Sequence, residues 1–70
     1  MKRISVASDV MSSVGYDSAA AVLEVEFRNG SVYEYLEVPR GHYDALLDAA
    51  SKGRFFNACV RPAFRFRRVT

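Results

Sequence analysis

The chain has 70 residues, of which 50% are apolar, 26% charged and 13% aromatic, and its formal net charge is +2. This composition is typical of one small folded domain and excludes a disordered segment, and no apolar run approaches the roughly 20 residues that a membrane helix needs. A single cysteine and a single histidine exclude an internal disulfide and a zinc site built from these side chains.

The N-terminal part of the chain is weakly patterned. Its basic start is not followed by a long apolar core, so we expect no secretory signal and a cytoplasmic protein. Ile4 and Val6 indicate a short strand, and a polar stretch follows them. Asp17-Ser18 indicates a turn, because these side chains readily hydrogen-bond to their own backbone.

The clearest pattern is a β-hairpin over residues 22–38. Apolar and charged residues alternate up to Phe27, as they do in a half-buried strand. Asn29-Gly30 follows, which is the strongest short-range signal for a hairpin turn. The second strand contains the sequence Tyr-Glu-Tyr.

Two registers of this hairpin are open. A two-residue turn pairs Glu24 with Tyr35 and places both tyrosines on the charged face of the sheet. A three-residue loop with a glycine bulge pairs Val25 with Tyr33 and places both tyrosines on the apolar face, because a slip of one residue exchanges the faces. We favour the second register, although it sets Glu24 opposite Glu34.

Two helices and a last strand are expected after the hairpin. The first helix runs from Pro39, a residue favoured at the first helical position, to about Ala50, and its apolar stripe packs on the sheet. Gly53 is the expected stop, and a second helix covers residues 54–60. A last strand over residues 63–69 alternates phenylalanine with arginine near the sheet edge. The chain, residues 1–70, is therefore predicted as one α+β domain, with an antiparallel sheet of three to five strands and two helices packed on one face.

Charge is divided unevenly along the chain. Residues 1–50 contain four basic and eight acidic side chains and carry −4, whereas residues 51–70 contain six basic side chains, no acidic one, and carry +6. Segregated positive charge indicates an anionic partner, but the basic segment can equally pair with the acidic part of the same molecule. Both interpretations are open. The basic segment also contains four phenylalanines: Phe55, Phe56, Phe64 and Phe66.

No catalytic constellation is present in the sequence. His42 stands alone early in the first predicted helix and is expected at the surface, and Cys59 is expected to be a buried, unreactive thiol. A phosphate-binding glycine loop, a nucleophile elbow and a zinc-protease motif are all absent. We therefore expect no enzymatic activity, no metal and no cofactor.

Aromatic and basic side chains instead favour a binding function. Single-stranded nucleic acid is held by cations on its phosphates and by aromatic rings against its bases. Tyr33 and Tyr35 are the candidate rings, and their exposure depends on the register. The phenylalanines are expected in the core, because so small a domain needs them there. The basic candidates are Lys52, Arg54, Arg61, Arg65, Arg67 and Arg68.

Several short segments combine at characteristic spacings over about residues 10–66. They include Val14-Gly15-Tyr16-Asp17, Asn29-Gly30, Tyr33-Glu34-Tyr35, Val38-Pro39, Ser51-Lys52-Gly53 and Phe55-Phe56-Asn57. Together they resemble the KTSC domain, a small domain named for its place at the C-terminus of some lysyl-tRNA synthetases, which also occurs alone as a short bacterial protein. Leu36 departs from the family, which more often has an aromatic residue there.

The resemblance implies RNA binding, because of the family's attachment to a synthetase. By this resemblance, Tyr33 and Tyr35 are the expected binding residues, with Lys52 and Arg61 as the matching basic positions. The other arginines, Arg54, Arg65, Arg67 and Arg68, are candidates from the charge pattern of this chain alone. We therefore expect a non-enzymatic RNA-binding module. Two alternatives are open: a homo-oligomer that binds a nucleotide-like ligand between subunits, and a protein–protein adaptor whose basic strand pairs with a partner.

Overall fold

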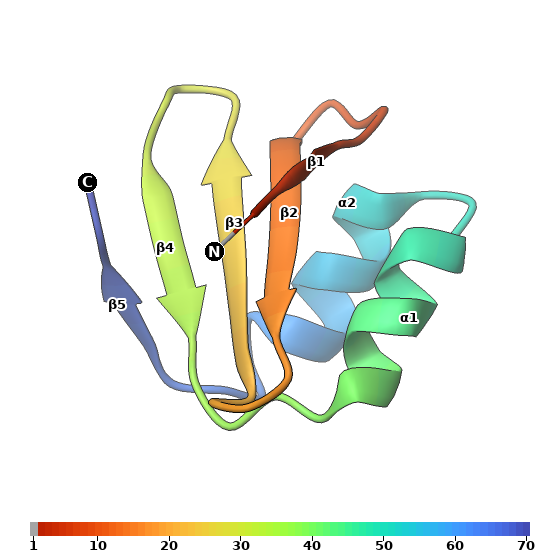
Figure 1. Ribbon diagram of the computed structural model, residues 1–70. Coiled ribbons are helices and arrows are strands. Elements are labelled where there is room, and N and C mark those ends of the chain that lie inside the picture. Colours follow the sequence, from red (N-terminus) through yellow and green to blue (C-terminus); the bar gives the residue numbers. More distant parts are fainter. Residues whose placement is uncertain (1) are drawn as a thin grey trace.

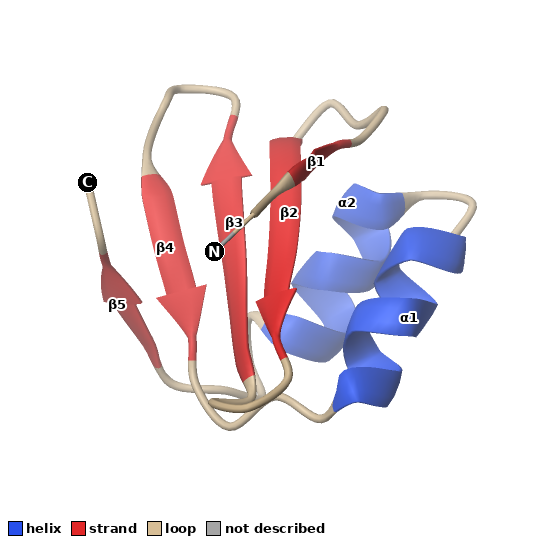
Figure 2. Ribbon diagram, in the orientation of Figure 1, coloured by secondary structure: helices blue, strands red, loops and turns tan. Residues whose placement is uncertain are grey.

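The computed structural model describes residues 2–70 and consists of an antiparallel sheet with its helices on one face (Figure 1, Figure 2). The strand order β1-β2-β3-β4-β5 follows the chain, so each strand pairs with its neighbours in sequence. The predicted α+β class, with an antiparallel sheet and two helices, is confirmed. The elements are β1 (Ile4–Ser5), β2 (Met11–Asp17), β3 (Val22–Phe27), β4 (Val32–Tyr35), α1 (Arg40–Asp48), α2 (Lys52–Phe55), the π-helical turn η1 (Phe56–Val60) and β5 (Phe66–Arg68).

Strand β2 is the element that the sequence pattern does not reveal. It has seven residues and pairs with both β1 and β3. Its alternation is hidden because both of its faces are covered: Val14 is buried in the core, and Gly15 lies under the N-terminal segment. The predicted turn after it is confirmed, since the Asp17 carboxylate accepts the backbone N–H groups two and three residues further on.

The β3–β4 hairpin adopts the favoured register, with the three-residue loop. Val25 pairs with Tyr33, and the Phe27 N–H donates to the Ser31 carbonyl at 2.8 Å. Gly30 closes the loop at a φ of +90°, a conformation that glycine adopts without strain. Both tyrosines of β4 therefore lie on the apolar face of the sheet.

The same register places Glu24 opposite Glu34, and two arginines neutralise this pair. Arg3 forms an ion pair with Glu24, which is buried. Arg67 of β5 forms an ion pair with Glu34 at 2.7 Å. Part of the basic C-terminal segment thus pairs with acidic residues of the same chain.

The helix boundaries differ from the prediction at both ends of α1. Pro39 is the N-cap rather than the first helical residue, since its ψ of 146° is extended. The helix ends at Asp48, so Ala50 lies outside it and is exposed. Gly53 does not stop a helix but lies within α2. A Cβ at Gly53 would come within 2.7 Å of Val10 Cγ2, so the missing side chain serves close packing rather than termination.

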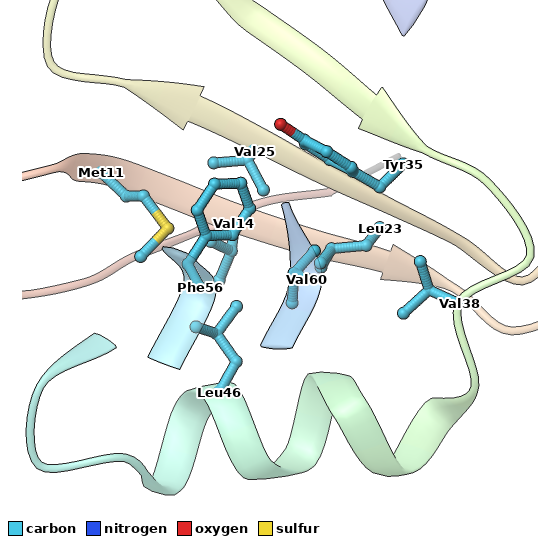
Figure 3. Packing of buried hydrophobic residues seen from close by; sticks show 9 residues of the cluster. All are labelled: Met11, Val14, Leu23, Val25, Tyr35, Val38, Leu46, Phe56 and Val60. Atoms are coloured by element: carbon cyan, nitrogen blue, oxygen red, sulfur yellow. The ribbon is translucent and has the colours of Figure 1, made fainter. Parts of the chain in front are cut away.

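One apolar core joins the sheet to the helices (Figure 3). Phe56 and Val60 of η1 are fully buried and lie between the strands and Leu46 of α1. Burial of such side chains is the main stabilising contribution in a domain of this size. The core consists of Met11, Val14, Leu23, Val25, Tyr35, Val38, Leu46, Phe56 and Val60.

Two predictions of burial are wrong. Cys59 is exposed, because the inward positions of η1 are Phe56 and Val60 and Cys59 falls on the outer side of the turn. Phe66 is 56% exposed, because the core cluster extends across the sheet only as far as β4 and does not reach β5. β5 is also shorter than the predicted strand over residues 63–69.

The N-terminal segment crosses the outer face of the sheet at Gly15. A Cβ on Gly15 would lie 2.6 Å from the Lys2 carbonyl oxygen. This close approach lets Arg3 Nε donate to Ser13 Oγ at 2.9 Å while the guanidinium reaches Glu24. Gly15 thus permits the contact that neutralises the buried carboxylate.

We expect Gly15→Ala to destabilise the domain by about 1–3 kcal/mol, because the added methyl group forces the backbone of the N-terminal segment away. Gly41→Ala is the matched control. Its Cβ would meet nothing within 4 Å, and replacing a helical glycine should stabilise α1 by about 0.5–1 kcal/mol. Thermal unfolding followed by circular dichroism measures both, and an unchanged midpoint in Gly15→Ala would contradict this account.

Candidate functional site

A groove of about 530 Å³ opens on the helix-facing side of the sheet, next to the core. The core cluster on this side draws on β2, β3 and β4, whereas β5 at the far edge is exposed (Figure 1). The groove therefore lies where the helices leave the sheet open. Its lining is Val10, Phe27, Arg28, Asn29, Ser31, Tyr33, Tyr35, Arg61 and Phe66, and we call it the aromatic groove.

Aromatic rings form the floor of this groove. The Tyr33 ring centre lies 5.5 Å from that of Phe27 and 5.5 Å from that of Phe66. The Tyr35 ring lies 5.6 Å from Phe66 and 5.2 Å from the core ring of Phe56. Tyr35 is only 3% exposed, whereas Tyr33 is half-buried. Tyr33 and Phe66 therefore present aromatic surface to a ligand, with Tyr35 behind them.

Two arginines lie over these rings. The Arg61 guanidinium carbon is 5.8 Å from the ring centre of Phe27 and 5.4 Å from that of Phe56. The Arg68 guanidinium carbon is 6.0 Å from the ring centre of Tyr33. A guanidinium held over an aromatic face keeps N–H donors for an anion. The groove thus offers flat apolar surface and positive charge together.

Burial and the nearby Arg61 guanidinium both affect the pKa of the Tyr35 hydroxyl. Burial raises the pKa of Tyr35 above its usual value of 10.0, while the nearby positive charge of Arg61 lowers it. Burial is the larger effect. Tyr35 is therefore a neutral hydroxyl at physiological pH and can donate or accept a hydrogen bond in the groove.

The structure brings some of the predicted binding residues together and separates the others. Those at the aromatic groove are Tyr33, Tyr35, Arg61 and Arg68. Lys52 and Arg54 line a second groove. Arg67 lies on the opposite face of the sheet, where it pairs with Glu34, and Arg65 lies 3.8 Å from Glu37. Intramolecular pairing thus accounts for Arg65 and Arg67 of the basic segment, and an anionic partner for the other basic residues stays a prediction.

Sequence reasoning missed several groove residues. Phe66 is absent from the predicted site because the sequence predicts the phenylalanines of the basic segment in the core. Phe27 shares the apolar face with Tyr33 in the favoured register, which is the signal that could have indicated it. Arg28 falls in the predicted hairpin loop, next to that face, and loop position alone does not indicate where its long side chain lies.

Residues 2–70 contain no group of three or more His, Cys, Asp or Glu side chains that could hold a metal ion. His42 is partly buried, and its ring meets the Phe64 ring edge-on at 5.1 Å between centres. No helix among the described residues has the length and apolar character needed to cross a membrane.

The raised pKa of Tyr35 predicts a pH dependence of stability. The native phenol keeps its proton to higher pH than the unfolded one, so its contribution is complete below pH 10 and declines as pH rises through the native pKa. Arg61→Gln should raise this pKa further, because the cation lowers it. A ¹³C NMR titration of tyrosine Cζ measures the change, and Tyr35→Phe assigns the resonance. A lower pKa in Arg61→Gln would contradict the prediction.

Comparison with known proteins agrees with this architecture. The model of the KTSC domain family matches residues 7–64. The crystal structure of a KTSC domain protein from Yersinia pestis matches with a TM-score of 0.95 and 36% identity, covering 99% of this chain and 97% of that one.

Similar sequences occur in two settings. An uncharacterized protein from Stutzerimonas stutzeri (strain A1501) is 43% identical over 70 residues and is covered over 99% of its length. A lysine–tRNA ligase from Nostoc punctiforme is 36% identical over 61 residues, which are 87% of this chain and 11% of the ligase. The domain thus resembles both a stand-alone protein and a small part of a synthetase. The chain belongs to the KTSC domain family.

Proposed function

We propose that this domain is a non-enzymatic RNA-binding module that holds single-stranded RNA in the aromatic groove. The observation that carries the proposal is the half-buried Tyr33 ring, which packs between Phe27 and Phe66 and lies under the Arg68 guanidinium. Rings of this kind stack on bases, and nearby cations bind phosphates.

The exposure of the rings supports a division of roles. Phe66, which is exposed, and Tyr33, which is half-buried, are the surfaces for a base. Tyr35 is too buried to stack and instead supports Phe66 from behind, with its hydroxyl available at the groove wall. Arg61 and Arg68 supply positive charge beside these rings.

The choice of RNA as the ligand has independent support. A lysine–tRNA ligase is named for an RNA substrate, and a domain similar to this chain forms part of one. Homo-oligomerisation stays a prediction.

We expect a fluorescein-labelled single-stranded RNA of mixed sequence to bind the protein in fluorescence anisotropy titrations. Affinity should fall as salt is raised, because phosphate contacts release counterions. Tyr33→Ala should weaken binding by about 1–3 kcal/mol through the loss of stacking, whereas Tyr33→Phe should retain it. Circular dichroism confirms that each variant is folded.

Matched arginine variants separate the groove from general positive charge. Arg61→Gln and Arg65→Gln each remove one positive charge, but Arg65 lies away from the groove, near Glu37. We expect Arg61→Gln to weaken binding and Arg65→Gln to leave it nearly unchanged. The proposal fails if the wild-type protein binds no RNA at low salt, or if the two arginine variants weaken binding equally.

A further inference from the structure

A second groove adjoins the aromatic groove and differs from it in chemistry. It has a volume of about 570 Å³, and none of its lining residues is aromatic. Its charged residues are three cations and one anion, Arg28, Lys52, Arg54 and Asp9. We call it the polar groove, and its excess of positive charge suits phosphate.

Arg28 and Val10 line both grooves and therefore form the wall between them. Arg28 Nε and Nη2 donate to the Ser8 carbonyl oxygen at 2.9 Å and 2.7 Å. These two bonds fix the plane of the guanidinium and use two of its five N–H donors. The other donors of a pre-oriented cation thus lie at the boundary of the two grooves.

The wall itself is well supported. The Arg28 N–H donates to the Val10 carbonyl at 3.1 Å, which ties the end of the hairpin to the segment before β2. Ser8 Oγ accepts the Val10 N–H at 3.0 Å. On the other side, Gly53 of α2 packs directly on Val10. Three parts of the chain that are far apart in the sequence therefore meet here. The wall is already ordered, so binding of a ligand to it costs little conformational entropy.

We infer that the ligand is a chain of at least two linked nucleotides, which runs from the aromatic groove past Arg28 into the polar groove. This inference rests on the proposed function and names its second subsite. One base stacks on Tyr33, the linking phosphate contacts the free donors of Arg28, and the next nucleotide lies near Lys52 and Arg54. A lone nucleotide fills only the first subsite.

Isothermal titration calorimetry with adenosine 5′-monophosphate, the dinucleotide pApA and a hexaadenylate tests this inference, and the matching uridylates test base dependence. We expect pApA to bind about tenfold or more tightly than the mononucleotide, because it adds charge-assisted hydrogen bonds in the polar groove. Arg28→Gln should weaken binding of all three adenylates.

The double variant Lys52→Gln/Arg54→Gln should remove most of the gain from mononucleotide to dinucleotide and leave mononucleotide binding unchanged. The control Arg40→Gln/Arg65→Gln removes the same charge at positions outside both grooves and should keep the gain. Equal affinity for the mononucleotide and the dinucleotide would overturn the inference, and so would an equal loss of dinucleotide affinity in both double variants. Neither result would contradict the proposed function, provided that RNA binding still depends on Tyr33. Absence of binding by any RNA or nucleotide would instead overturn the proposed function, and the inference with it.

Discussion

The presence of Tyr33 and Tyr35 in the aromatic groove depends on the register of the β3–β4 hairpin. Side chains alternate along a strand, so a slip of one residue would move both tyrosines to the opposite face. The loop closed by Gly30 sets the observed register. In the other register Glu34 would lie among apolar side chains, and an unpaired buried carboxylate costs several kcal/mol. Here it meets Glu24 on the outer face, where Arg3 and Arg67 compensate both charges.

The hydrophobic core and the aromatic groove share one face of the sheet. β2 and β3 bury their apolar side chains under the helices, whereas β4 and β5 continue the aromatic surface beyond them. Phe56 connects the two regions, since its ring packs on Tyr35 and lies under the Arg61 guanidinium. The aromatic groove is therefore formed by side chains that pack directly on the rigid core. A ligand bound there would require little rearrangement of the protein.

Local patterns in the sequence predict much of this arrangement, and distant contacts account for what they miss. The hairpin follows from alternation and from Asn29-Gly30, and the sorting of apolar side chains onto one face favours the observed register, in which Val25 pairs with Tyr33. The exposure of Phe66 could not be predicted in the same way, because it depends on how far the helices reach across the sheet. Gly53 has the sequence signature of a helix stop, but it lies within α2 and packs against Val10. The place of Arg28 likewise depends on the Ser8 carbonyl, 20 residues away.

The central claim is that a base of single-stranded RNA stacks on the rings exposed beside β5. Intermolecular nuclear Overhauser effects between RNA base protons and the ring protons of the protein test it most directly. The account predicts contacts from a base to the rings of Tyr33 and Phe66, with none to Ser13 on the opposite face of the sheet. Contacts confined to the opposite face, or an RNA complex in which neither ring approaches a base, would contradict it.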